Sequence, residues 1–260
     1  MRVALTIAGS DPSGGAGIQA DLKTFHQFGV YGEAVITLIT VQNTQRVSRV
    51  QTLSADLVME QLEAVLEDIP PDAAKTGALG SMEVVRCLAR AAATYEFPLV
   101  VDPVLISTQG RRLLAPEAVD VLRTELFPRA ALVTPNLPEA ELLSGIAIRG
   151  TEELYRAAET IRAHGAGAVL IKGGHREGSA TDVLLDDEGW HEFPAPRIET
   201  VHTHGTGCTY SAAITAGLAC GLPLRDAISR AKEFIHAAIA AAPKLGRGCG
   251  PLNHHAGDTP

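Results

Sequence analysis

A glycine-rich turn late in the chain combines residues that could bind an anion with one that could move a proton. It reads His204-Gly205-Thr206-Gly207-Cys208, and the small-residue pattern after it predicts a helix from about Gly207 to Cys220. The N–H groups and the positive dipole end at a helix start hold anions without basic side chains. Cys208 falls in the first turn of that helix, where we expect the thiol pKa to lie below its usual value of roughly 8.5. We therefore predict that Cys208 is partly ionised and takes a proton from a substrate hydroxyl. The alternative is a buried cysteine that only packs.

A second glycine-rich turn follows the first predicted strand, Val3 to Ala8. Its segment from Gly15 to Ala20 fits the dinucleotide-binding pattern G-x-G-x-x-A. A dinucleotide fold also needs an acidic residue after the second strand, whereas this strand, about Ala34 to Val41, runs into Gln42-Asn43. Asp11 would repel a phosphate, and the chain contains no G-x-x-x-x-G-K-S/T loop. We therefore disfavour a dinucleotide site at this turn, and a turn that only caps a helix is the alternative.

The elements that must position these turns follow a repeating pattern. Short β-branched runs alternate with helical stretches, which is typical of βαβ units around a mostly parallel sheet. Further strands are predicted at about Ala73 to Thr76, Leu99 to Asp102, Ala131 to Thr134 and Ala168 to Lys172. In such sheets ligands bind beyond the carboxyl ends of the strands. We therefore expect the polar residues at these ends to converge, namely Asp11, Gln42, Lys75, Asp102, Asn136 and Lys172.

The pattern changes after Lys172. A hairpin is predicted from Thr181 to Phe193, and a second late helix from about Leu224 to Ala242. Since the chain has no internal repeat and no low-complexity linker, we expect residues 1–243 to form one α/β domain. Residues 244–260, with Gly, Pro and His, are expected to form a partly ordered tail.

Composition excludes several classes of function. The 260 residues include 22 Lys and Arg against 30 Asp and Glu, a net charge of -8, so no nucleic-acid partner is expected. Val3 to Ala8 is too short for a signal peptide, and no apolar run is long enough for a membrane helix. We therefore expect a cytoplasmic protein without a membrane partner. The four cysteines form no C-x-x-C pair, which argues against a disulfide scaffold.

Six motif blocks follow the turn at Gly9 to Gly17 in order, and the similarity that they carry covers about residues 3 to 242. They are Gln42-Asn43-Thr44, Lys75-Thr76-Gly77, Val101-Asp102-Pro103-Val104, Thr134-Pro135-Asn136-Leu137-Pro138-Glu139-Ala140-Glu141, Lys172-Gly173-Gly174-His175 and His204-Gly205-Thr206-Gly207-Cys208-Thr209. In these blocks and in the early turn Gly9-Ser10-Asp11-Pro12-Ser13-Gly14-Gly15-Ala16-Gly17, the chain resembles the hydroxymethylpyrimidine/phosphomethylpyrimidine kinases of thiamine biosynthesis. The resemblance implies a ribokinase-like, three-layer α/β/α domain with a mostly parallel central sheet. Because members are commonly dimers, a homodimer is expected.

The resemblance also implies how the site handles its substrate. Gly9 and Asp11 would border the pyrimidine, and Gln42 would read its edge, since an amide can pair with a ring nitrogen and an exocyclic amine together. Cys208 would be the catalytic base. Gly205, Thr206 and Gly207 would complete the anion hole for the transferred phosphoryl group.

For the phosphoryl donor, the resemblance implies ATP and Mg²⁺. Lys172, with Thr206 and Gly207, would bind the nucleotide, while Asp102, Asn136 and Glu139 would hold the metal through oxygen ligands and water. Taken alone, the segment Thr134 to Glu139 could simply be a capped helix start.

Some alternatives stay open at this stage. The family often has methionine where this chain has Ala78, which affects the expected wall of the substrate pocket. A pyridoxal kinase on the same scaffold and a non-catalytic pyrimidine-binding sensor are the rival functions. Metal binding by His202, His204 and Cys208, or by His254-His255, is disfavoured because a zinc site needs a fourth ligand and a stable frame.

Overall fold

One large sheet organises the chain. The computed structural model describes residues 1–106, 110, 112–173 and 180–256. In these residues nine strands form a sheet of order β3-β2-β1-β4-β5-β6-β7-β8-β9. The strands are β1 (Val3–Ser10), β2 (Tyr31–Gln42), β3 (Val47–Thr52), β4 (Ala73–Thr76), β5 (Leu99–Val101), β6 (Leu132–Val133), β7 (Val169–Ile171), β8 (Asp182–Asp186) and β9 (Gly189–Phe193). The central pairs from β2 to β7 are parallel, and β3, β8 and β9 run antiparallel to their neighbours.

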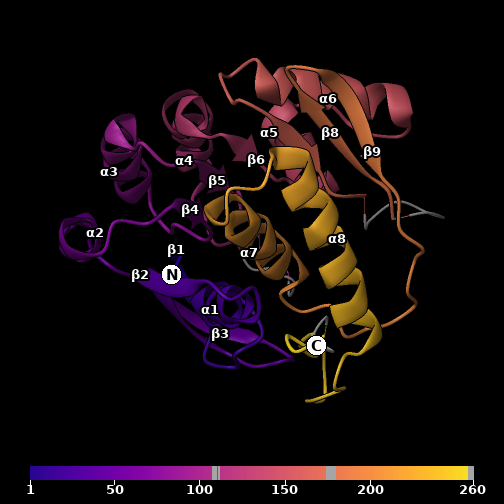
Figure 1. Ribbon diagram of the computed structural model, residues 1–260, viewed down its shortest axis with the longest axis horizontal. Coiled ribbons are helices and arrows are strands. Elements are labelled where there is room, and N and C mark those ends of the chain that lie inside the picture. The colour runs from indigo at the N-terminus through magenta and orange to yellow at the C-terminus, as the bar shows by residue number, and fades with distance from the viewer. Residues whose placement is uncertain (107–109, 111, 174–179, 257–260) are drawn as a thin grey trace.

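Helices cover both faces of the sheet, as Figure 1 shows. One layer contains α1 (Gly17–Gln27), α7 (Thr206–Ala219) and α8 (Leu224–Ala240). The other contains α2 (Ala55–Asp68), α3 (Met82–Ala91), α4 (Pro116–Val121), α5 (Leu137–Ser144) and α6 (Thr151–Arg162), with short turns η1 (Ala92–Thr94), η2 (Leu122–Leu126) and η3 (Phe127–Arg129). The three-layer α/β/α architecture with a mostly parallel sheet is thereby confirmed.

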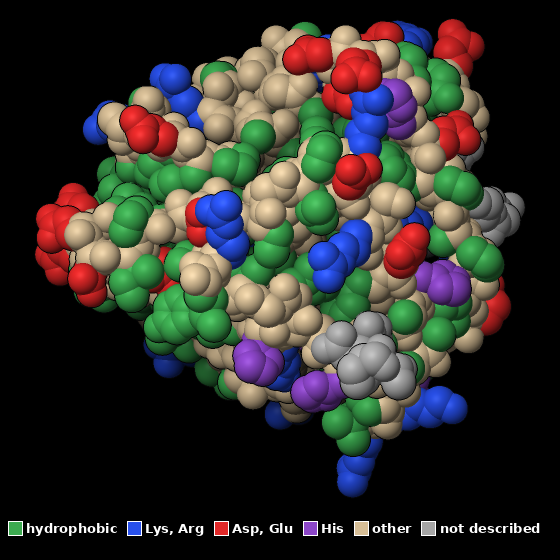
Figure 2. Space-filling model, viewed as in Figure 1, with side chains coloured by type: hydrophobic (Ala, Val, Ile, Leu, Met, Phe, Trp, Pro, Cys, Tyr) green, Lys and Arg blue, Asp and Glu red, His purple; other side chains and the backbone are tan. Residues whose placement is uncertain are grey.

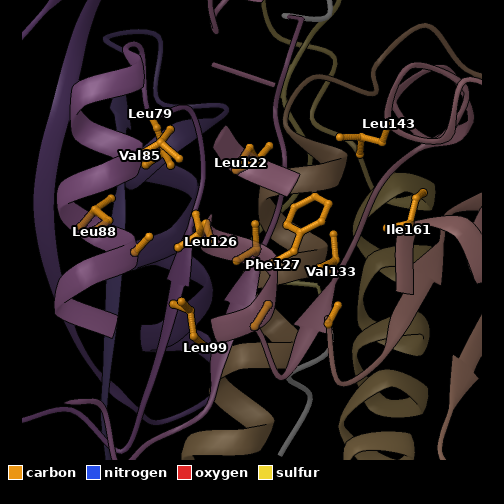
Figure 3. Close-up of a cluster of buried hydrophobic side chains, with 14 of the residues drawn as sticks. Leu79, Val85, Leu88, Leu99, Leu122, Leu126, Phe127, Val133, Leu143 and Ile161 are labelled. Atoms are coloured by element: carbon orange, nitrogen blue, oxygen red, sulfur yellow. The ribbon is translucent and has the colours of Figure 1, made fainter. Parts of the chain in front are cut away.

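Alternation along the strands divides the core between the two helical layers. On β5, Leu99 and Val101 pack with α2 to α6, whereas Val100 packs with α7 and α8. Successive side chains of a strand point to opposite faces, so a strand covered on both sides is apolar throughout. Figure 3 shows the first of these clusters, in which Leu126 and Phe127 face the sheet.

Most elements expected from the sequence are present, with shifts at their ends. The hairpin of β8 and β9 is confirmed, and α7 and α8 begin within one residue of their predicted starts. Strand β3 was not predicted. It pairs with β2, and its residues are half-buried or exposed, so it lacks the apolar run of an inner strand. No helix among the described residues is long and apolar enough to span a bilayer.

The chain after α8 packs against the site side of the domain. Gly248 N donates to Thr44 Oγ1 (3.3 Å), His204 N donates to the Gly250 carbonyl (3.1 Å), and Asn253 N donates to the Ala238 carbonyl (3.1 Å). Residues 244–256 therefore contact both the β2–β3 loop and the segment that precedes α7.

Candidate active site

A cavity of about 650 Å³ runs along the carboxyl ends of the parallel strands. Five of the six residues expected to converge line it, which are Asp11, Gln42, Asp102, Asn136 and Lys172. The sixth, Lys75, is fully buried and lies outside the cavity wall, so the expectation was wrong for this residue. Lys75 projects instead toward the layer of α1 and α7, where it meets Asp21.

The late glycine turn forms the N-terminus of α7 and lines the cavity. Gly205 is the N-cap residue with φ of 82°, and a Cβ there would collide with the carbonyl oxygen of Gly15. A Cβ on Gly207 would lie 3.3 Å from Lys172 Nζ and 3.7 Å from Asp102 Oδ2. Gly205 is therefore required by its φ and by the close approach of Gly15, whereas a methyl group at Gly207 would press on the Lys172 ammonium group. The first N–H groups of α7 have no partner within the helix, which is the arrangement that binds anions.

Cys208 occupies the first turn of α7 and lines the cavity, as predicted, but its ionisation differs from the expectation. Burial raises the pKa of the thiol to about 12, and the charge of Lys75 and the Gly17 N–H lower it by less. The prediction of a lowered pKa was therefore wrong: the half-buried thiol stands in the cavity wall, and desolvation by the protein around it outweighs the helix N-terminus. The thiol is protonated at neutral pH.

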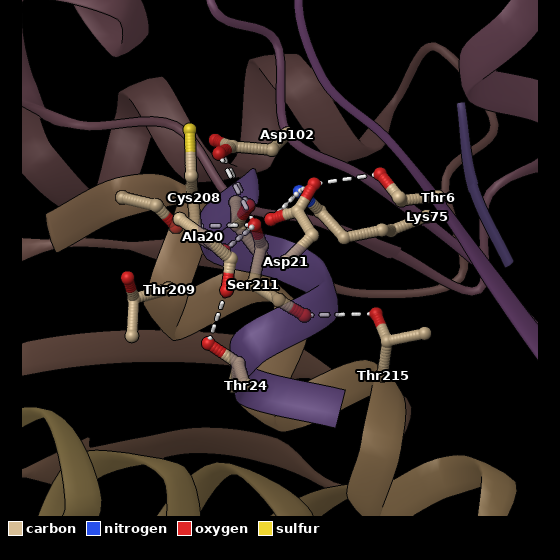
Figure 4. Close-up of polar contacts among 12 residues, drawn as sticks. Thr6, Ala20, Asp21, Thr24, Lys75, Asp102, Cys208, Thr209, Ser211 and Thr215 are labelled. Carbon is tan, nitrogen blue, oxygen red and sulfur yellow. Dashed lines mark hydrogen bonds and ion pairs between the residues drawn. The ribbon is translucent and has the colours of Figure 1, made fainter. Parts of the chain in front are cut away.

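A buried ion pair lies beneath Cys208. Lys75 Nζ contacts both carboxylate oxygens of Asp21 at 2.8 Å, both side chains are fully buried, and Thr6 Oγ1 donates to Asp21 at 2.6 Å (Figure 4). Burial lowers the pKa of Lys75, but the charges of Asp21 and Asp102 raise it by more, so the amine stays charged. The pair fixes α1 against β4 at this point.

A second ion pair borders the cavity itself. Lys172 Nζ lies 2.9 Å from Asp102 Oδ1, and Ser211 Oγ donates to Asp102 Oδ2 at 3.2 Å. The side chain of Lys172 is 12% exposed, so its ammonium group can still reach a ligand. Although burial lowers the pKa of Lys172, Asp102 and Glu139 raise it above its usual range. Lys172 therefore stays charged, and its ammonium group is paired with Asp102 next to the start of α7.

Asn136 and Glu139 form a capping box at the start of α5. Asn136 Oδ1 accepts the N–H of Glu139, and Glu139 Oε2 accepts the N–H of Asn136, each at 2.9 Å. Glu139 Oε1 also accepts the N–H of Leu105 at 3.3 Å. Burial raises the pKa of Glu139, and Asp102 adds to this, while Lys172 opposes it. The capped helix start is thus present, in the cavity wall.

These residues fit magnesium only in one manner. Within the described ranges no cluster of three or more His, Cys, Asp or Glu could hold a metal ion by itself. Mg²⁺ usually keeps several waters and uses one or two carboxylates together with substrate phosphates, so it needs no protein cage. Asp102 and Glu139 offer such oxygens beside Lys172, and a nearby cation would favour the ionised form of Glu139.

The first glycine turn also lines the cavity, although the carboxylate of Asp11 is turned into the protein. Asp11 Oδ1 accepts from the N–H and hydroxyl of Ser13, and Oδ2 accepts from Ala16 N and faces His204. Burial raises the pKa of Asp11, but hydrogen bonds from His204, Ser13 and Gln42 lower it to about 2. Gly9 meets Leu38, where a Cβ would collide with that side chain. Gly9, Asp11 and Gln42 thus share one end of the cavity.

The far end of the cavity was not recognised from the sequence. It is lined by Pro196, Tyr210, Lys232, Ile235 and Ile239. Lys232 Nζ contacts Asp182 Oδ2 at 2.7 Å. These residues lie on α7, α8 and the segment after β9. In the sequence, Ile235 and Ile239 stand four residues apart on a helix, a spacing equally typical of core residues.

Comparison with known proteins places this geometry in a class of kinases. The described chain superposes on Bacillus subtilis pyridoxal kinase in its ADP complex with a TM-score of 0.90 and 41% identity, over 98% of each chain. It also superposes on phosphomethylpyrimidine kinase from Clostridium difficile with a TM-score of 0.82 and 44% identity, over 92% of this chain and all of that one. The fold is that of the ribokinase-like vitamin kinases.

The family itself follows from the sequence comparisons. The family model for phosphomethylpyrimidine kinase matches residues 11–253. The hydroxymethylpyrimidine/phosphomethylpyrimidine kinase of Rhizobium meliloti is 52% identical over 97% of this chain and 96% of that protein. The chain belongs to the phosphomethylpyrimidine kinase family and is a kinase.

Proposed function

We propose that this kinase transfers the γ-phosphoryl group of ATP to the hydroxymethyl group of 4-amino-5-hydroxymethyl-2-methylpyrimidine and then to the resulting monophosphate. The diphosphate serves thiamine biosynthesis. The observation that carries the proposal is that the α7 N-terminus and Cys208 line the same cavity as Gln42 and Lys172. Family membership supports the same reaction.

The substrate end accounts for binding of the pyrimidine. Gln42 stands at the end of β2, where its amide can donate to a ring nitrogen and accept from the exocyclic amine. Gly9 and Leu38 provide a flat apolar wall. In this arrangement the hydroxymethyl group points toward Cys208, and the backbone of the Asp11 turn encloses the ring.

Transfer takes place at the start of α7. The thiolate form of Cys208 accepts the proton of the substrate hydroxyl while that oxygen bonds to the γ-phosphorus and ADP leaves. The N–H groups of Gly205, Gly207 and Cys208 stabilise the charge on the transferred group, while the Thr206 N–H donates to the Thr203 carbonyl at 3.2 Å. Lys172 neutralises charge on the nucleotide. Mg²⁺, when bound, neutralises phosphate charge and orients the phosphates. Asp102, Asn136 and Glu139 would hold it through water.

Direct assay tests the activity. The purified chain, ATP and Mg²⁺ are incubated with the pyrimidine alcohol. The monophosphate and diphosphate are then separated and identified by mass spectrometry. Both products should accumulate in sequence. No product under conditions where the Rhizobium meliloti relative gives turnover would refute the proposal. Hydrolysis of ATP, or transfer of its phosphoryl group, would also exclude the alternative of a non-catalytic pyrimidine-binding sensor.

Pyridoxal is the second candidate substrate, because a solved pyridoxal kinase shares this fold at 41% identity. Ala78 lines the substrate end, and its Cβ is 3.6 Å from the position a Cβ on Gly9 would take. A small side chain there leaves room for the additional ring substituents of pyridoxal. Comparison of kcat/KM for the two alcohols decides between them, and a higher value for pyridoxal would reassign the enzyme.

We also propose a homodimer and a cytoplasmic location. Ile39 and Val41 on β2 are 47% and 54% exposed, and Tyr31 on the same strand is 49% exposed. Ile39 and Val41 stand two residues apart on this strand, and such an exposed apolar pair suits contact with a second copy of the chain. On the face in Figure 2, Lys and Arg lie among Asp and Glu, which gives no support to a nucleic-acid partner. Sedimentation and cell fractionation test the two proposals.

A further inference from the structure

A buried contact joins the two glycine-rich turns. His204 Nε2 lies 2.7 Å from Asp11 Oδ2, although the residues are 193 positions apart in the chain. Their side chains are 4% and 3% exposed. A carboxylate and an imidazole at this distance and depth form a charge-assisted hydrogen bond when the ring carries both protons, or an N–H to carboxylate bond when it carries one on Nε2. In either case the ring donates to Asp11.

The two residues of this contact belong to two different turns of the proposed site. Asp11 organises the turn at the substrate end, since its two oxygens accept from Ser13 and from Ala16 N. His204 directly precedes Gly205, the N-cap residue of α7, so its ring is attached to the start of the anion hole. Close packing of Gly205 on the carbonyl of Gly15 brings the two turns into direct contact.

The backbone of His204 is held from behind as well. Its N–H donates to the Gly250 carbonyl at 3.1 Å, and it forms an isolated parallel bridge with Pro251. Among the described residues its Nδ1 is buried without a hydrogen-bond partner. The bond from Nε2 to Asp11 is therefore the side-chain polar contact that fixes the ring.

We propose that His204 is a positioning residue for phosphoryl transfer, which holds the anion-hole turn in register with the substrate turn through Asp11. This role rests on the proposed function and deepens it. The turn at Asp11 places the acceptor alcohol, and the turn at Gly205 places the phosphoryl group. Their relative position sets the distance between the attacking oxygen and phosphorus. An error of about 1 Å in such a distance can lower a rate by about a hundredfold.

The test compares two substitutions of one residue. Gln places an amide nitrogen about where Nε2 stands, so His204→Gln keeps the bond to Asp11, while the shorter side chain of His204→Asn loses it. We expect His204→Asn to lower kcat by about tenfold to a hundredfold with little change in KM for the pyrimidine or ATP. His204→Gln should stay within about threefold of the wild-type kcat. His202→Asn is the matched control, since His202 lies two residues earlier and has no contact with Asp11 among those described.

A stability measurement separates the pair from general packing. Denaturant unfolding of Asp11→Asn, His204→Asn and the double variant should show that the two effects are not additive. A wild-type kcat in His204→Asn, equal losses of kcat in His204→Asn and His204→Gln, or additive unfolding effects would each overturn the inference. A wild-type chain that gives no turnover would instead refute the proposed function, which is a separate result.

Discussion

Replacement of Cys208 should affect the two phosphorylation steps unequally. In the first step the acceptor is an alcohol, whose proton must leave as the bond to phosphorus forms. In the second step the acceptor is a phosphate monoester with a second pKa near 6, so its oxygen carries no proton at about pH 8. A base is therefore required for the first step only. Cys208→Ala should lower kcat/KM of the first step by about a hundredfold or more, and of the second by less than about threefold.

The raised pKa of Cys208 gives this prediction a pH signature. With a thiol pKa of about 12, the thiolate fraction of the free enzyme is about one in ten thousand at pH 8 and rises tenfold per pH unit. We expect kcat/KM for the alcohol to rise about tenfold per unit from pH 7 to 9, and kcat/KM for the monophosphate to stay nearly level over the same range.

The assay supplies each acceptor separately and follows ADP release. Cys220→Ala is the matched control, because Cys220 is exposed at the other end of α7. Equal losses for both acceptors in Cys208→Ala would refute the division of roles. A level pH profile for the alcohol would refute thiolate catalysis from a high pKa.

Three further substitutions test other parts of the site. Asp11 has a pKa of about 2 in the folded protein against 3.8 in model compounds, so its ionisation contributes about 2 kcal/mol to the free energy of unfolding above about pH 4. This contribution is lost as the pH falls toward 2. In urea unfolding, Asp11→Asn should therefore lose less stability than the wild type between pH 4 and pH 2. Gly207→Ala puts a methyl group 3.3 Å from Lys172 Nζ and should raise KM for ATP at unchanged stability, whereas unchanged KM would contradict an anion site there. Lys75→Met leaves Asp21 buried without its cation and should cost about 3 kcal/mol or more in denaturant unfolding, most of it regained when Asp21→Asn is added.

Strand ends and motif blocks could be predicted because they depend on local pattern. The parallel strands, the hairpin of β8 and β9 and the start of α7 all follow from residues close in sequence. The direction of Lys75 could not, because it depends on a partner 54 residues away on α1. Nothing local distinguishes a lysine that lines a cavity from one that is buried against an aspartate.

The same limit explains the error at Cys208. Its place at the start of α7 was predicted correctly, and a helix N-terminus does favour a thiolate. The effect of the helix N-terminus is small beside desolvation, and the groups around the thiol, such as Lys75 and Asp21, come from segments far away in the sequence.

The proposed nucleotide site is compatible with an acidic chain, because the groups that would bind the anion are gathered at one place and not spread over a basic surface. Lys172 already faces Asp102, so the bare cavity carries little net charge at this point. A phosphate near Gly207 would lie beside the ammonium group, since a Cβ on Gly207 is only 3.3 Å from it. Backbone N–H groups add donors without adding counter-charges that must be neutralised in the empty site. A net charge of -8 therefore argues against extended polyanions and is compatible with the proposed site for a single triphosphate.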